Sequence, residues 1–148
     1  MPSTYLSLHY HIVFATKERR PLILPSWQVR FHEYLAGTVH GLGGYSQAVG
    51  GVSDHVHLLI GLKSTHCLAD FMRELKKHSS AWVHNTVGSA AFAWQEGYSA
   101  FTVSATARGG VTKYIANQEA HHRKLTYREE FVMLLEKAGV PFDLKYIE

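Results

Sequence analysis

The fold is decided by the stretch Gly51-Val52-Ser53-Asp54-His55-Val56-His57-Leu58-Leu59-Ile60, an apolar run that carries two histidines one residue apart. The run favours a β-strand, and alternate side chains of a strand share a face. His55 and His57 therefore point the same way, as a candidate pair of metal ligands. Two histidines that are hydrogen bonded or face solvent would explain the same spacing equally well.

A second histidine pair lies in residues 5–15, where apolar and polar side chains alternate. The alternation predicts a strand with one face on a core and His9 and His11 on the more polar face. If this strand neighbours the one that carries His55 and His57, all four imidazoles lie close together. Two partly exposed strand histidines remain the simpler interpretation of His9 and His11.

The remaining pattern predicts the order β-α-β-β-α-β followed by two helices. We expect further strands over 45–49, 91–95 and 98–104, and helices that begin near Ser26, near Ser64 or Thr65, at Val111 and at Thr126. Thr126 and Glu129 have the spacing of a capping box. This order predicts an α+β fold, a ferredoxin-like sandwich with an antiparallel sheet.

Length and composition indicate one globular domain, residues 1–148, with 46% apolar and 18% charged residues. No apolar run approaches the roughly 20 residues of a membrane span, and the N-terminus lacks a secretory signal pattern. We therefore expect a cytoplasmic protein.

The single cysteine, Cys67, excludes a disulfide framework and a multi-cysteine zinc site. A net charge of +3 fits a polyanionic partner, and eleven histidines are unusually many.

Polar side chains share a face of the helix predicted after Gly109-Gly110. Tyr114 and Gln118 are four residues apart, and His121 falls close to the same stripe. A tyrosine on an amphipathic helix is commonly a packing residue with a wet hydroxyl, so this stripe alone does not identify a nucleophile.

Three segments together resemble the single-tyrosine HUH transposases, which include insertion-sequence and REP-associated enzymes that act on single-stranded DNA. The segments are His55-Val56-His57-Leu58-Leu59-Ile60, residues 92–104, and Tyr114-Ile115-Ala116-Asn117-Gln118-Glu119-Ala120-His121-His122. The resemblance extends over nearly the whole chain, from His11 to Tyr146.

The resemblance implies a metal-dependent HUH endonuclease in which His55, His57 and Gln118 bind Mg²⁺ or Mn²⁺ and Tyr114 is the nucleophile. Two imidazole ligands favour Mn²⁺. The implied reaction is transposition by cutting and rejoining single-stranded DNA, at hairpin ends, through a 5′-phosphotyrosine intermediate. It also implies a homodimer in which the tyrosine helix is able to pair with the metal site of its own or of the other subunit, and Gly109-Gly110 would provide a mobile connection for this. His9, His11 and His121 are candidates for supporting the metal ligands.

Basic side chains on two segments are candidates for contacts to DNA phosphates, which would make binding salt-dependent. They are Arg19, Arg20, Arg73, Lys76 and Lys77.

Two other functions fit the residues. One is a metal-dependent phosphoesterase that uses the histidine pairs without a covalent tyrosine, and it would survive Tyr114→Phe. The other is a nucleic-acid-binding regulator of ferredoxin-like fold with no chemistry. The absence of an aromatic RNA-binding strand counts against the regulator.

Overall fold

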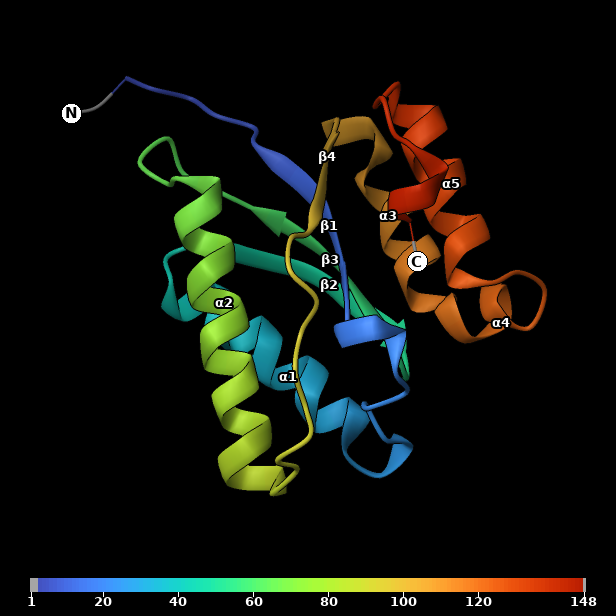
Figure 1. The fold of residues 1–148 in the computed structure, drawn as a ribbon. Coiled ribbons are helices and arrows are strands. Elements are labelled where there is room, and N and C mark those ends of the chain that lie inside the picture. The colour runs from blue at the N-terminus through green and yellow to red at the C-terminus, as the bar shows by residue number, and fades with distance from the viewer. Residues whose placement is uncertain (1–2, 148) are drawn as a thin grey trace.

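A four-stranded antiparallel sheet with helices on both faces forms the centre of the computed structural model, which describes residues 3–147 (Figure 1). The strands are β1 (His9–Ala15), β2 (Tyr45–Val52), β3 (His55–Gly61) and β4 (Ser99–Val103), in the spatial order β2-β3-β1-β4. Helix α1 (Pro25–Gly41) joins β1 to β2, and α2 (Leu68–Trp82) joins β3 to β4. The predicted α+β sandwich is confirmed, and β1 and β3 are neighbours as expected.

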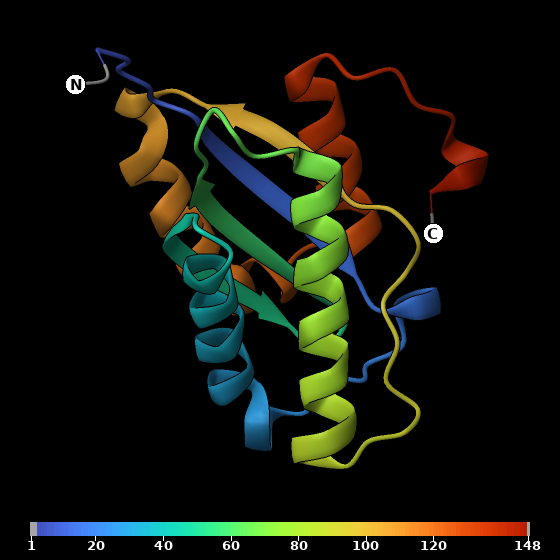
Figure 2. The same ribbon diagram turned by 90° about the vertical axis from the view of Figure 1, so that its left-hand side faces the viewer.

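Helices α1 and α2 pack on one face of the sheet (Figure 2). Alternate residues of β1 and β3 point into this layer, because successive side chains of a strand face opposite ways. The buried core contains Ile12, Phe14, Val56, Leu58 and Ile60 from the strands and Phe31, Leu35, Met72 and Leu75 from the helices. The apolar faces that the sequence periodicity predicts for the strands and the helices pack against each other in this core.

The other face of the sheet is covered by α3 (Arg108–Ala116), α4 (Gln118–His122) and α5 (Tyr127–Ala138) (Figure 1). This face carries His11 and Val13 of β1 and His55 and His57 of β3. These helices bury His55 and His57 completely and leave His11 only 5% exposed, so the interpretation of His11 as a partly exposed strand histidine is wrong. The histidines thus lie between two packed layers.

The single helix expected from Val111 to Arg123 is two helices. Helix α3 begins at Arg108, so Gly109-Gly110 lie in its first turn and do not form the mobile connection suggested by the sequence. The chain leaves helical geometry at Asn117, with φ −101° and ψ 22°. Tyr114 and Gln118 therefore belong to consecutive helices.

A glycine on β2 determines how closely α3 approaches the sheet. A Cβ atom at Gly50 would lie 2.3 Å from the carbonyl oxygen of Ile115. Since no side chain fits in that space, the absence of a Cβ lets the end of α3 rest directly on the strand. Ile115 is next to Tyr114, so this contact also sets the position of the tyrosine.

Other boundaries differ in detail from those predicted. The first strand begins at His9 because Tyr5 and Leu6 are exposed and unpaired with the sheet. Within 91–95 only Trp94 pairs, in an isolated bridge with Thr16. Helix α2 begins at Leu68 after an N-cap at Cys67, without a side-chain cap from Ser64 or Thr65. Short helical turns are η1 (Lys17–Arg19), η2 (Val83–Val87), η3 (Ala105–Ala107) and η4 (Leu144–Tyr146).

Helix α5 has the predicted capping box between Thr126 and Glu129, and it ends at Gly139 in the left-handed conformation, with φ 70°. No helix within residues 3–147 is long and apolar enough to cross a membrane.

Candidate metal centre

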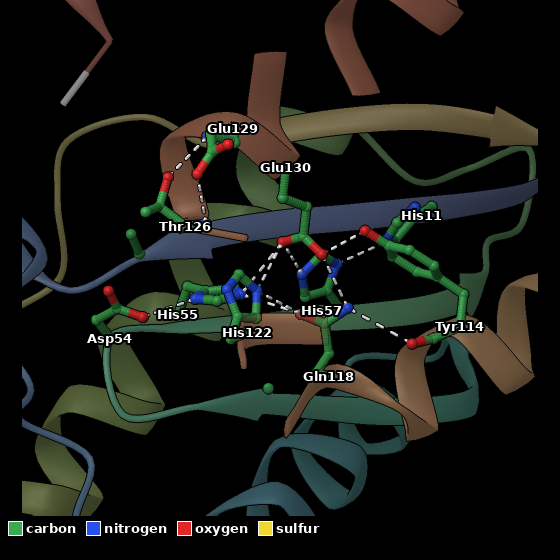
Figure 3. Close-up of polar contacts among 12 residues, drawn as sticks. His11, Asp54, His55, His57, Tyr114, Gln118, His122, Thr126, Glu129 and Glu130 are labelled. Carbon is green, nitrogen blue, oxygen red and sulfur yellow. Dashed lines mark hydrogen bonds and ion pairs between the residues drawn. The ribbon is translucent and has the colours of Figure 1, made fainter. Parts of the chain in front are cut away.

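The carboxylate of Glu130, on α5, lies at the centre of a buried polar cluster between the sheet and the helices (Figure 3). Three imidazoles surround its Oε1 atom, with the Nε2 atoms of His57, His122 and His55 at 3.1, 3.2 and 3.4 Å. Its Oε2 atom accepts hydrogen bonds from Gln118 Nε2, at 3.1 Å, and from the Tyr114 hydroxyl. One carboxylate thus joins residues from β3, α3, α4 and α5.

Gln118 faces the same point through its side-chain oxygen. Its Oε1 lies 3.2 Å from Nε2 of His55 and 3.1 Å from Nε2 of His122. The ligand atoms of His55, His122 and Glu130 all lie within 4.8 Å of one another, a spacing that allows them to hold a metal ion. Imidazole nitrogens and carboxylate and amide oxygens are suitable ligands for a divalent cation.

Each sheet histidine is oriented through its other ring nitrogen. His55 Nδ1 is hydrogen bonded to Asp54 Oδ1 at 2.7 Å, and His57 Nδ1 to His11 Nε2 at 2.8 Å. These contacts leave the Nε2 atoms of His55 and His57 facing the cluster. Metal-binding histidines are commonly fixed in this way by a hydrogen bond to the distal nitrogen.

The charges of the cluster follow from burial and from Glu130. Burial lowers the pKa of His57 to about 4, despite the nearby carboxylate. Burial also acts on His55, but hydrogen bonds and charges from Asp54 and Glu130 outweigh it and raise the pKa of His55 to about 9. Burial opposes ionisation of Glu130, yet hydrogen bonds from the histidines hold its pKa below the ordinary range. A metal would therefore displace a proton from His55 on binding.

Tyr114 is adjacent to these groups. Its ring centroid lies 5.8 Å from that of His57 and 4.6 Å from that of His121. Burial and the Glu130 carboxylate raise the pKa of the Tyr114 hydroxyl above its ordinary value. A hollow of about 530 Å³ opens onto Tyr114 and Glu130, lined also by His121 and by apolar residues of α5.

The structure brings together most of the site residues suggested by the sequence. His55, His57, Tyr114 and Gln118 meet in one cluster, with His11 and His121 in contact with it. His9 lies elsewhere, hydrogen bonded to Ser7 and beside Gly61.

Three residues of the cluster were missed in the sequence. His122 follows Gln118 by four residues, the same interval that separates Gln118 from Tyr114, and this spacing could have identified it. Asp54 directly precedes His55 and could have been noted as its partner. Glu130 had no signal, because nothing in the pattern of α5 distinguishes its carboxylate from that of Glu129.

The predicted DNA-binding cations divide between two regions. Arg19 and Arg20 lie at and directly after η1, whereas Arg73, Lys76 and Lys77 belong to α2, on the face of the sheet opposite the cluster (Figure 1). Arg73 pairs with Asp70 at 3.0 Å, and Lys76 Nζ donates to the carbonyl oxygens of Gln95 and Gly97. The α2 cations therefore do not join the metal centre.

Comparisons of the sequence and of the structure with known proteins both point to transposases. The sequence model of the family described as "Transposase IS200 like" matches residues 4–118. A crystal structure from Deinococcus radiodurans, provisionally assigned as a transposase, is similar with a TM-score of 0.63 and 26% identity, over 80% of this chain and 96% of that one. No functionally curated protein has a significantly similar sequence.

A second solved structure is that of a REP-associated tyrosine transposase bound to a REP hairpin. It has a TM-score of 0.59 and 14% identity, over 82% of this chain and 74% of that one, and at this identity the similarity shows the fold alone. The family match ends at Gln118, so His122 and Glu130 lie beyond it.

Proposed function

Since this chain belongs to the IS200-like transposase family, we propose that it cuts and rejoins single-stranded DNA with Tyr114 as the nucleophile. The observation that carries this proposal is the contact of the Tyr114 hydroxyl with a carboxylate that also meets three imidazoles and an amide. The fold shared with a transposase bound to a REP hairpin supports a hairpin end as the substrate.

The proposed reaction conserves the phosphodiester energy. The Tyr114 hydroxyl loses its proton as its oxygen forms a bond to phosphorus, the bond from phosphorus to the 3′ oxygen breaks, and the 3′ oxygen takes up a proton, so that no proton is gained or lost overall. The products are a 5′-phosphotyrosine and a free 3′-hydroxyl. Attack by a 3′-hydroxyl on the phosphotyrosine reverses the step, so strands can be rejoined without ATP.

The donor set fits a divalent cation. His55, His57 and Gln118 are the ligands implied by the family resemblance, and we propose that His122 and Glu130 join or exchange with them. A cation there would supply Lewis acidity to a phosphate oxygen. Three imidazoles beside one carboxylate favour Mn²⁺ or another transition metal over Mg²⁺. The protein's part is to fix each donor, through Asp54 for His55 and through His11 for His57.

Tyr114 and the proposed ligands meet within one chain, so we propose that the site is complete in a single subunit. The homodimer implied by the resemblance stays a prediction, and sedimentation equilibrium with and without a hairpin would test it.

A covalent adduct is the direct test of the proposed reaction. With a labelled single-stranded hairpin and Mn²⁺, the protein should form an adduct that survives denaturation and maps to Tyr114. Tyr114→Phe should abolish it, whereas Tyr45→Phe, at an exposed tyrosine of β2, should not. An adduct on another tyrosine would refute the assignment. Cleavage that survives Tyr114→Phe would indicate the phosphoesterase, and binding without cleavage would indicate the regulator.

A further inference from the structure

The turn after β1 has an unusual backbone. Glu18 and Arg19 both have positive φ angles, 57° and 52°, which are unfavourable for residues other than glycine. The turn is tied to the start of β3, because the backbone nitrogen and the hydroxyl of Thr16 both donate to the carbonyl oxygen of Asp54, at 2.9 and 3.1 Å. The strained turn is thus anchored to the residue that orients His55.

This backbone directs the Arg19 side chain onto α5. Its guanidinium carbon lies 5.7 Å from the centre of the Tyr127 ring, and the Tyr127 ring lies 4.5 Å from that of His55. The Nε atom of Arg19 is buried without a hydrogen-bond partner, and Arg19 forms no ion pair within residues 3–147. Its neighbour Arg20 is instead exposed and paired with Glu18 at 3.1 Å.

Arg19 lines a groove that begins at the metal centre. The groove has a volume of about 530 Å³, and its walls include Asp54 and His122 of the cluster and the exposed Arg123 and Lys124. Figure 3 shows Asp54 next to His55 at this end of the cluster.

The carboxylates of the groove already accept hydrogen bonds from other groups of the protein, whereas its cations form no ion pair within the described residues. Asp54 is hydrogen bonded to His55, and Glu129 accepts from the Thr126 backbone in the capping box. No ion pair involves Arg123 or Lys124 in the part of the chain that the structure describes. Within the described residues, the groove therefore presents three cations that form no ion pair. A guanidinium that forms no ion pair suits a phosphate, which accepts two parallel hydrogen bonds.

We propose that Arg19 binds a backbone phosphate of the unpaired DNA strand that leads to the metal centre, with Arg123 and Lys124 along the same path. This subsite rests on the proposed function, since it names the route of the same substrate. It also separates Arg19 from the other cations suggested by the sequence, because Arg20 is paired and the α2 cations lie on the opposite face.

Binding of a fluorescein-labelled single-stranded oligonucleotide in EDTA, followed by anisotropy over a range of salt concentrations, tests the subsite without chemistry. Arg19→Ala should weaken binding at least about fivefold and reduce the slope of log K against log salt by about 0.7, the value for one phosphate contact on a single strand. Arg19→Gln, which keeps the stem on Tyr127, should give the same loss. Arg20→Ala should bind like the unmodified protein.

Equal binding by Arg19→Gln and the unmodified protein would overturn the subsite, as would an equal or larger loss in Arg20→Ala. Should Arg19→Ala fail to fold by circular dichroism, Arg19→Gln decides the matter. The proposed reaction fails separately, by the absence of a Tyr114 adduct in the unmodified protein. Either result can therefore occur without the other.

Discussion

Oε1 of Glu130 lies 3.1 Å from Nε2 of His57, although 73 residues separate the two along the chain. His57 is on a central strand within the part that matches the family, and Glu130 is on a helix beyond it. The buried histidine face is therefore closed by a segment outside the family signature. This segment contributes the Glu130 carboxylate as a further candidate metal ligand.

Glu130→Gln should weaken Mn²⁺ binding at least about tenfold, because a neutral amide replaces the carboxylate that meets all three imidazoles. Isothermal titration calorimetry measures the affinity directly. Glu129→Gln, a neighbouring exposed carboxylate that can keep its capping contact as an amide, is the matched control. Equal Mn²⁺ affinities for the two variants would show that Glu130 is not a ligand.

Asp54→Asn should reduce Mn²⁺ affinity by about 10–100-fold, since the amide removes the negative charge by which Asp54 makes the ring of His55 a more basic ligand. Asp70→Asn removes an exposed carboxylate on α2 and should leave metal binding unchanged. Unchanged affinity in Asp54→Asn, measured by the same calorimetry, would mean that the charge of Asp54 does not support His55 as a ligand.

Gly50→Ala should destabilise the protein by about 1–3 kcal/mol and lower the yield of the Tyr114 adduct, because the added methyl group collides with the carbonyl of Ile115. Gly37→Ala is the control, since nothing lies within 4 Å of a Cβ atom there and alanine favours the helix. Urea unfolding gives the free energies. A fully active and stable Gly50→Ala would show that α3 adjusts without disturbing the nucleophile.

Acid should destabilise the fold partly through His32. Burial lowers the pKa of His32 from 6.5 to about 4, so the unfolded chain binds the additional proton between these values. Stability should fall as the pH falls through that range, by up to about 3 kcal/mol from this residue. His32→Leu should lose less free energy of unfolding than the unmodified protein between pH 7 and about pH 4.5. Parallel curves for the two proteins would contradict the prediction.

The sheet was predictable because its signals are local. The alternation around His55 and His57, the helical spacing of α1 and α2, and the order of these elements were enough to predict the α+β sandwich. The break at Asn117 was not predictable, because the periodicity from Tyr114 to His121 continues through it. Nor was burial of the histidine face, which depends on where α5 docks.

The candidate site was predictable only where its residues are close in sequence or carry a family signature. His55, His57, Tyr114 and Gln118 meet both conditions. Glu130 meets neither, and it enters the cluster only because the turn after α4 reverses the chain and the capping box starts α5 at Thr126. Its partners are thus set by tertiary packing, which the sequence of α5 alone does not encode.

Complete burial of His55 and His57 has a consequence for how the proposed metal site would acquire an ion. A cation bound there would leave through the openings beside Glu130 and His122, because the sheet and the helices close the other sides, so its residence time would depend on these openings as well as on affinity. We therefore expect kinetic trapping, in which the ion captured during folding is retained. Protein refolded in Mn²⁺ and protein refolded in Zn²⁺ should then keep different metals through prolonged dialysis.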